Sequence, residues 1–191
     1  YINTAGIGLI KATPLSPARI RENDAILVTG TLGDHHACIL SQRMGIENSI
    51  KSDAAPLCGI VAALMDSGME IHCIRDITRG GLATILNELA SAAGLRAEIW
   101  EENLPVSEEV AGLCGVLGLD PLYMGNEGKM VVILPWEQHG RALQVIKSAR
   151  YGGNAEVIGK FTEGRGAVLK TKIGGLRTLS VLAGEGLPRI C

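Results

Sequence analysis

The stretch from Glu70 to Gly94, EIHCIRDITRGGLATILNELASAAG, decides the fold. Residues 70–75 are typical of a short strand, and Gly80-Gly81 then opens a segment whose apolar residues recur at helical spacing, namely Leu82, Ile85, Leu86 and Leu89. Gly94 lies where a glycine commonly ends a helix. The stretch therefore predicts a strand, a glycine turn and a helix with one apolar side.

The same arrangement precedes this stretch. Residues 25–29 predict a strand, Gly30-Thr31-Leu32-Gly33 predicts a turn, and Asp34 is the predicted N-cap of a helix that runs to about Met44. A second helix is expected at 57–65, where apolar residues recur at i, i+3, i+4, i+7 and i+8 and a C-terminal glycine follows. Its apolar side must pack against a sheet.

Strands and helices also follow Gly94. In chain order we expect strands at 95–100, 129–134, 156–161 and 167–172, and helices after the N-cap Ser107 and at 136–148. The last two strands are expected to form a hairpin around the turn at 163–166. Strands and helices without strict alternation predict an α+β fold, a mixed β-sheet with packed helices.

The two ends of the chain differ from this body. Residues 2–9 predict one more strand, and because the chain opens without an initiator Met, we expect a fragment of a longer protein. Residues 13–24 read as a connection and 25–182 as the main domain. The last nine residues, 183–191, lack periodicity and have the composition of a mobile tail.

The composition excludes several classes of function. The 191 residues carry 18 Lys+Arg against 20 Asp+Glu, and aromatic residues make up only 3%. Neither the bulk positive charge nor the stacking residues of a nucleic-acid binder are present. The longest apolar runs are far shorter than the roughly 18 residues of a membrane span, and no secretion signal is evident, so we expect a cytoplasmic protein without nucleic-acid or membrane partners.

The five cysteines are odd in number and widely spaced, which fits neither a disulfide framework nor a zinc site. Cys38, Cys58, Cys73 and Cys114 lie in apolar patterns and are expected to be small buried side chains. Cys191 differs because it is the last residue. A thiol on a flexible tail can enter a cleft, be modified and be handed to a partner.

Two glycine loops are candidate anion sites. In the first, residues 30–36, Asp34 and His35 stand where a helix begins, although Asp34 may serve only as an N-cap. In the second, residues 75–81, Asp76 and Arg79 precede Gly80 and Gly81. Arginine binds phosphate and carboxylate groups in a bidentate manner, whereas the alternative is an Asp76–Arg ion pair that only ties the loop.

A third glycine loop holds a single carboxylate. Asn126-Glu127-Gly128-Lys129 follows Gly125, so Glu127 is either a buried acid/base or a solvated turn residue, and the local sequence favours the second. No set of metal ligands is apparent in the chain.

These loops and the chain's ending together resemble the HypE family, the carbamoyl dehydratases of nickel–iron hydrogenase maturation. The resemblance is carried by Ile2-Asn3-Thr4-Ala5-Gly6-Ile7-Gly8, Gly30-Thr31-Leu32-Gly33-Asp34-His35, Arg75-Asp76-Ile77-Thr78-Arg79-Gly80-Gly81, Asn126-Glu127-Gly128-Lys129 and Pro188-Arg189-Ile190-Cys191. It covers essentially the whole chain, and the ending is its most specific part. The wider superfamily includes aminoimidazole ribonucleotide synthetase, selenophosphate synthetase and thiamine-monophosphate kinase.

The resemblance implies a reaction at Cys191. Its thiol would be carbamoylated by the partner HypF and then dehydrated with ATP and Mg²⁺ to a thiocyanate, whose cyanide passes to iron on a HypC–HypD complex. Glu127 would be the catalytic base. The glycine loops, with Asp34, His35, Asp76, Arg79, Gly80 and Gly81, would contact ATP.

The resemblance also implies a missing half. The family's N-terminal domain, which binds most of the ATP and the magnesium and forms the homodimer, would precede Tyr1, and residues 1–12 would be its last strand. This piece alone should then be inactive. His36 is a second departure, because family members commonly have glycine at that position.

Two other interpretations remain open from the sequence. In the first, the chain belongs to another ATP-dependent synthetase or kinase of the superfamily, which would act on a free small molecule and be indifferent to Cys191. In the second, it is a docking module that presents its tail to maturation partners and contributes no catalytic group.

Overall fold

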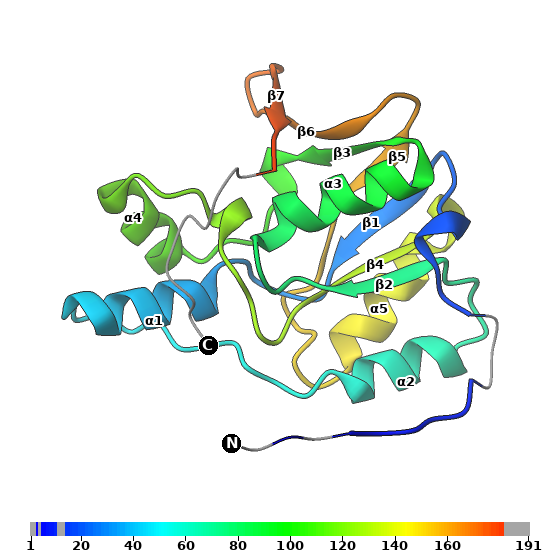
Figure 1. Cartoon of the computed structure of the whole chain (residues 1–191), viewed down its shortest axis with the longest axis horizontal. Helices are drawn as coiled ribbons and strands as arrows, with labels where there is room; N and C mark the ends of the chain where they lie inside the picture. Colours follow the sequence, from blue (N-terminus) through cyan, green and yellow to red (C-terminus); the bar gives the residue numbers. More distant parts are fainter. Residues whose placement is uncertain (1–2, 4, 11–13, 182–191) are drawn as a thin grey trace.

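The computed structural model describes residues 3, 5–10 and 14–181. Seven strands form one sheet in the order β2-β4-β1-β5-β3-β6-β7 (Figure 1). The strands are β1 Asp24–Val28, β2 Cys73–Asp76, β3 Arg96–Trp100, β4 Met130–Pro135, β5 Glu156–Thr162, β6 Gly166–Lys170 and β7 Leu176–Leu179. Every pairing is antiparallel except that of β3 with β6, so the sheet is mixed.

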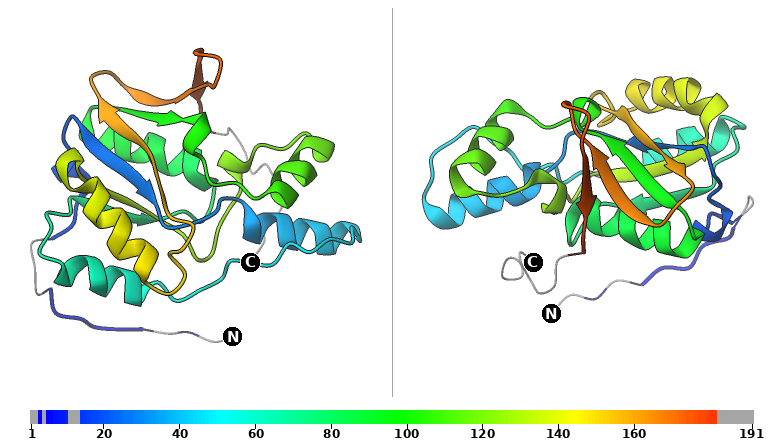
Figure 2. Two further views of the ribbon diagram at one scale, coloured as in Figure 1. Left: turned by 180° about the vertical axis from the view of Figure 1, so that it is seen from behind. Right: turned by 90° about the horizontal axis from the view of Figure 1, so that it is seen from above.

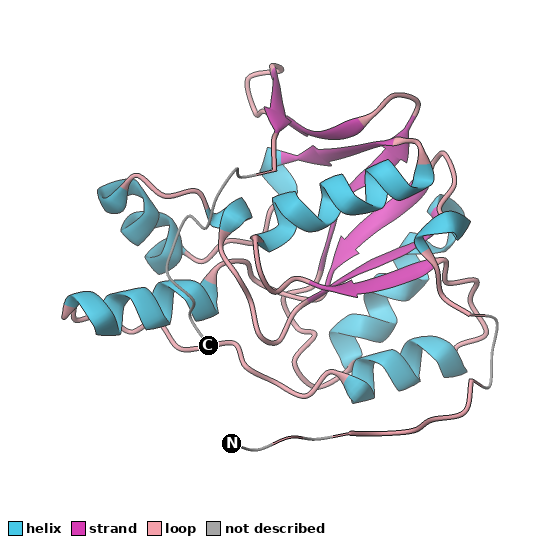
Figure 3. Ribbon diagram, in the orientation of Figure 1, coloured by secondary structure: helices cyan, strands magenta, loops and turns pink. Residues whose placement is uncertain are grey.

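The described residues form five α-helices, which pack on the faces and at one end of the sheet (Figure 3). They are α1 Asp34–Met44, α2 Cys58–Asp66, α3 Gly81–Ala93, α4 Glu108–Leu117 and α5 His139–Ser148, with 3-10 turns η1 Pro17–Arg19, η2 Glu101–Asn103, η3 Pro121–Tyr123 and η4 Trp136–Gln138. The predicted α+β class, a mixed sheet with packed helices, is confirmed.

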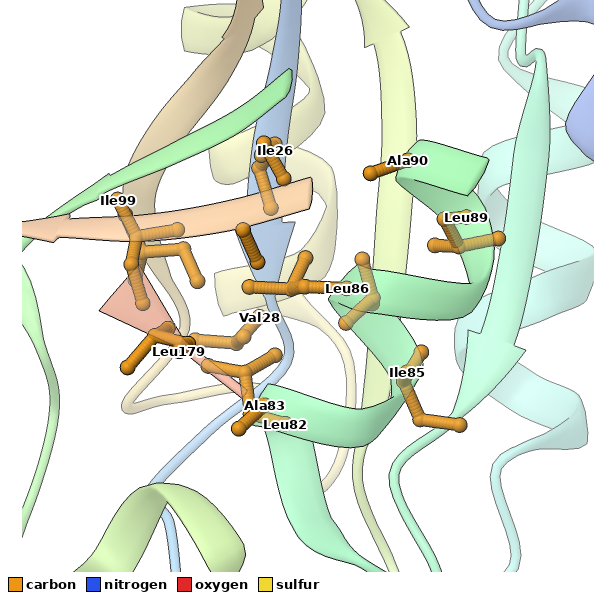
Figure 4. Packing of buried hydrophobic residues seen from close by; sticks show 14 of the residues in the cluster. Ile26, Val28, Leu82, Ala83, Ile85, Leu86, Leu89, Ala90, Ile99 and Leu179 are labelled. Carbon is orange, nitrogen blue, oxygen red and sulfur yellow. The ribbon is translucent and has the colours of Figure 1, made fainter. Parts of the chain in front are cut away.

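The central strand β1 is buried on both sides, and its alternate residues enter different cores. Ile26 and Val28 pack with the apolar side of α3, as Figure 4 shows. Ala25 and Leu27 pack on the opposite face with residues of α2 and α5. The helices therefore cover both faces of the sheet, and the view from behind in Figure 2 shows α2 and α5 together.

Helices α1 and α4 lie beyond one end of the sheet, next to each other (Figures 1 and 2). Ala37 of α1 joins Val110 and Cys114 of α4 in a small separate apolar cluster that also contains Met124. This cluster supports the loops at that end of the sheet.

The predicted hairpin of the last two strands is wrong. Strand β3 lies between β5 and β6, antiparallel to the first and parallel to the second. The turn between β5 and β6 therefore crosses the end of β3, where a Cβ on Gly164 would lie 2.7 Å from the Arg96 guanidinium. Strand β7, which pairs with β6, has no counterpart among the predicted elements.

The predicted strand at residues 2–9 is also not formed in the described part of that segment. Residues 3 and 5–10 have no strand geometry, and Ile7, Leu9 and Ile10 are 105%, 88% and 79% exposed. A strand is stable only beside a partner, and no described strand pairs with this segment. Its assignment to a preceding domain stays a prediction, and the predicted tail at 183–191 lies outside the described residues.

Two smaller expectations are corrected. Asp34 is the first residue of α1, and the N-cap is Gly33 in the left-handed conformation, with φ of 87°. Cys58 is exposed because it begins α2, whereas Cys38, Cys73 and Cys114 are buried as expected. In the described ranges, no helix has the length and apolarity needed to cross a membrane.

Candidate active site

The side chain of Asn126 holds the three glycine loops together. It is fully buried, and its Oδ1 accepts a hydrogen bond of 2.8 Å from the main-chain N–H of Gly33. Its Nδ2 donates to the carbonyls of Ile77 at 3.3 Å and Met124 at 3.1 Å. One amide group thus joins the first loop, the second loop and its own loop.

Main-chain contacts tighten this junction. The N–H of Asn126 donates to the carbonyl of Ile77 at 2.9 Å, and the N–H of Ile77 donates to that of Lys129 at 3.0 Å. Gly81 has φ of 65°, and a Cβ there would lie 2.6 Å from the carbonyl oxygen of Leu122. Only glycine allows the second loop to approach the third so closely.

Two helices begin at the junction, α1 after Gly33 and α3 after Gly80. Both of these N-cap glycines have positive φ, and neither helix start has a side-chain cap. Main-chain N–H groups at a helix start lack partners within the helix and attract anions. The junction therefore presents two helix starts suited to phosphate or carboxylate groups.

Glu127 stands at the surface of this junction. Its side chain is exposed, while its main-chain N–H donates to Oδ1 of Asp53 at 2.9 Å. The next residue, Gly128, is buried against the Asp53 main chain. The backbone of the third loop is thus fixed and the carboxylate projects from it, so any burial of Glu127 must come from outside the described residues.

Asp34 and His35 lie at the start of α1, as the sequence predicts. Asp34 accepts a hydrogen bond from the Thr31 hydroxyl. Burial raises the pKa of Asp34 and the Asp53 carboxylate adds to the rise, while the Thr31 hydroxyl and the Lys129 ammonium oppose it. His35 is partly exposed, and its Nδ1 lies 2.8 Å from Oγ of Ser52.

Asp53 is a site residue that the sequence reasoning missed. Its carboxylate side chain is only 3% exposed, and Oδ2 lies 3.6 Å from Nζ of Lys129, whose side chain is 10% exposed. No pattern marks Asp53, which precedes Glu127 by 74 positions in a segment without regular structure. Lys129 belongs to the third loop, but no pattern in the sequence assigns it a role.

The second loop contributes Asp76 and Arg79, both exposed. Oδ2 of Asp76 accepts from the Thr78 hydroxyl at 2.9 Å, and Arg75 pairs with Glu88 at 3.1 Å. The alternative Asp76–Arg ion pair is therefore not formed among the described residues. Within the same ranges Arg79 has no ion pair, so its guanidinium is available to an anion.

His36 occupies a buried position behind the third loop, 6% exposed. Its Nδ1 accepts from the N–H of Gly125 at 3.4 Å, and its own N–H donates to the carbonyl of Gly125 at 3.3 Å. Burial lowers the pKa of this imidazole, and His35 and Arg43 act in the same direction. His36 therefore makes close contacts with the main chain of Gly125, at a position where family members commonly have glycine.

The predicted site residue Cys191 lies outside the described residues. Across residues 3, 5–10 and 14–181, no three His, Cys, Asp or Glu side chains group in a way that could hold a metal ion.

Comparison with known proteins identifies relatives of the whole chain. Residues 21–172 match the family described as AIR synthase related protein, C-terminal domain. Carbamoyl dehydratase HypE of Azotobacter vinelandii is 43% identical over 196 residues, which cover 100% of this chain and 58% of that protein. The matched part is the C-terminal portion of such relatives, so this chain spans less than two thirds of their length.

Solved structures agree with the sequence match. A crystal structure of the hydrogenase maturation protein HypE in complex with ATP has a TM-score of 0.87 and 42% identity, covering 93% of this chain and 55% of that one. A HypE–HypF complex has a TM-score of 0.85 and 36% identity, covering 88% and 56%. Because the family match extends over most of the seven-stranded sheet and its helices, the chain belongs to the AIR synthase related protein family, as its C-terminal domain, and is homologous to HypE.

Proposed function

We propose that this chain is the C-terminal part of a carbamoyl dehydratase that acts, with ATP, on its own carbamoylated Cys191 in the cytoplasm. The reaction converts the S-carboxamide into an S-cyanate and supplies cyanide for the iron of nickel–iron hydrogenases. The observation that carries the proposal is the junction at Asn126, where two helix starts and Glu127 meet. The proposal is supported by the 43% identical relative named carbamoyl dehydratase HypE, a name that describes dehydration of a carbamoyl group.

The reaction needs an anion site and a base. Transfer of the γ-phosphoryl group of ATP to the amide oxygen releases ADP and makes that oxygen a leaving group. The nitrogen loses one proton as the O-phosphate forms and a second as the C–O bond breaks. Phosphate then departs and the S–C≡N group remains.

Glu127 is proposed to take the proton in the elimination step. The third loop projects the Glu127 carboxylate from the junction, and this carboxylate has no hydrogen-bond partner among the described residues. A base must reach the proton directly, so a free carboxylate on a fixed backbone suits the role. We assign the binding of the departing phosphate to the two helix starts and Arg79.

ATP binding is proposed to be shared with a preceding domain. An ATP complex of HypE has the same fold over this chain. The uncapped starts of α1 and α3 and the available Arg79 fit phosphate oxygens. Among the described residues no three His, Cys, Asp or Glu side chains group in a way that could hold a metal ion, and we propose that the preceding domain binds Mg²⁺.

Partners follow from the same proposal. A HypE–HypF complex is among the homologous structures, and we propose a HypF-type carbamoyltransferase as the donor to Cys191. A HypC–HypD-type complex is proposed as the acceptor of the cyanide. The full-length enzyme is proposed to be a homodimer through its preceding domain.

Intact mass spectrometry of the full-length enzyme tests the proposal. After incubation with carbamoyl phosphate, ATP and the transferase, we expect a gain of about 43 Da. This gain should decrease to about 25 Da as the carbamoyl group on the Cys191 sulfur loses water. Cys191→Ser should show neither gain, and Cys58→Ser, at an exposed thiol far along the chain, should show both. An unmodified Cys191, or an enzyme indifferent to its replacement, would favour a sister synthetase or kinase.

A further inference from the structure

We propose that Asp53 is the positioning residue of the catalytic loop, because its carboxylate and main chain hold residues 127–129. This inference rests on the proposed function of Glu127. It assigns a role to the segment that follows α1, which has no regular structure and no place in the chemistry described above. Three contacts to three successive residues carry it.

The first contact fixes the backbone of the base. The main-chain N–H of Glu127 donates to Oδ1 of Asp53 at 2.9 Å. A charged acceptor makes such a hydrogen bond stronger than a neutral one. The side chain of Asp53 is only 3% exposed, so water competes little for this oxygen.

The second contact fixes the spacing of the two segments. A Cβ on Gly128 would lie 1.9 Å from the carbonyl oxygen of Asp53 and 2.9 Å from the N–H nitrogen of Ala55. Real side chains never approach backbone so closely, so the position admits only glycine without movement. The third loop therefore lies directly on the main chain of the Asp53 segment.

The third contact supplies the charge balance. Oδ2 of Asp53 lies 3.6 Å from Nζ of Lys129 and has no hydrogen-bond partner among the described groups. A buried carboxylate without a nearby cation is costly, and the Lys129 ammonium supplies that cation beside Asp53. The same ammonium packs over Gly30 of the first loop, where a Cβ would lie 2.8 Å from Cε of Lys129.

The Asp53 segment is itself anchored to the first loop. Oγ of Ser52 lies 2.8 Å from Nδ1 of His35 and accepts from the N–H of Ala54 at 3.2 Å. The segment therefore connects the start of α1 with the loop of Glu127. By holding the loop of Glu127, Asp53 would fix the position of this base relative to the start of α1, which is proposed to bind phosphate.

Asp53→Ala and Asp53→Asn in the full-length enzyme test this role. Asparagine retains an oxygen that can accept from Glu127, whereas alanine does not. We expect alanine to slow dehydration of carbamoylated Cys191 about 10–100-fold, with the KM for ATP nearly unchanged, and asparagine to restore most of the rate. Asp66→Asn, at an exposed position at the end of α2, is the matched control and should retain full activity.

Hydrogen exchange gives a readout that does not depend on catalysis. The Glu127 amide should exchange faster in Asp53→Ala than in the parent and should remain protected in Asp53→Asn. Gly128→Ala should have the same effects as Asp53→Ala while Asp53 stays intact, and Gly153→Ala, where a Cβ meets nothing within 4 Å, is its control. Gly128→Ala also serves if Asp53→Ala does not fold.

The outcomes separate this inference from the proposed function. If Glu127→Gln is inactive but Asp53→Ala and Gly128→Ala dehydrate at the parent rate, the positioning role is wrong and the proposed function stands. If Asp53→Asn is as slow as Asp53→Ala, the hydrogen bond to Glu127 is not what matters, and the inference is also overturned. If Glu127→Gln itself remains active, the proposed function fails, whatever the exchange data show.

Discussion

Asn126 shows how one buried side chain can organise a site. Three hydrogen bonds to Gly33, Ile77 and Met124 use its acceptor and both donors of its amide group. Burying such a group is favourable only when its partners are complete, because an unpaired buried donor or acceptor costs about 1–3 kcal/mol. The junction of the three loops should therefore be sensitive to this residue.

Asn126→Ala should lower the free energy of unfolding by about 2–4 kcal/mol, since it leaves the Gly33 N–H and two carbonyls without this partner. Urea unfolding of this chain measures the change. Asn154→Ala, at an exposed position, should stay within about 0.5 kcal/mol of the parent. Equal midpoints for the two variants would contradict the central role of Asn126.

The Asp34 carboxyl gives a pH-dependent prediction. Its pKa is raised from the ordinary 3.8, first by burial and also by Asp53, so the folded chain holds a proton that the unfolded chain releases. Stability from this group is then present at low pH and is lost as pH rises from 3.8 through the folded pKa. Asp34→Asn should therefore gain stability relative to the parent at pH 7 and not at pH 3.

Urea midpoints of the parent and Asp34→Asn across this range provide the measurement. A carbon-detected NMR titration of the Asp34 carboxyl should show its midpoint above 3.8. A midpoint below 3.8, or a variant advantage that grows as pH falls, would show that the carboxylate is stabilised in its ionised form.

At the scale of elements, local signals fixed most helices and strands. The helical spacing of apolar residues and the glycines at 68 and 94 predicted α2 and α3 closely. Pairing between strands was harder, because β3 enters between β5 and β6 and no local pattern shows which strand will occupy that place. Residues 2–9 predict a strand from their own sequence, but their described part lacks a described strand partner.

The glycine that begins α3 tests how tightly the elements pack. Gly81→Ala would place a Cβ 2.6 Å from the Leu122 carbonyl at a φ of 65°, and it should destabilise the chain by about 2 kcal/mol or more. Gly112→Ala in the exposed middle of α4, where a Cβ meets nothing within 4 Å, should instead stabilise by about 0.5–1 kcal/mol. Thermal unfolding compares them, and a neutral Gly81→Ala would rule out the close approach.

At the scale of the whole molecule, the site depends on contacts that the sequence separates widely. The loops that carry Asp34, Asp76, Arg79 and Glu127 were recognisable from their glycines. The structure brings these loops together where the strands of the sheet end. Asp53 was not recognisable, because its proposed role follows from its hydrogen bond to the main chain of Glu127, which exists only in the folded chain. The exposed side chain of Glu127 agrees with the solvated turn residue that its local sequence favours.

Conversion of the carbamoylated tail into a cyanate is proposed to depend on Glu127, which takes the proton of the elimination step. The direct measurement is the mass of Cys191 over time in full-length Glu127→Gln, after the transferase and ATP are added. We predict that the gain of about 43 Da forms at the parent rate, because the thiolate can still be carbamoylated, and that the decrease to about 25 Da does not follow, because the proton of the elimination step is not removed. A decrease to about 25 Da at the parent rate would contradict the claim.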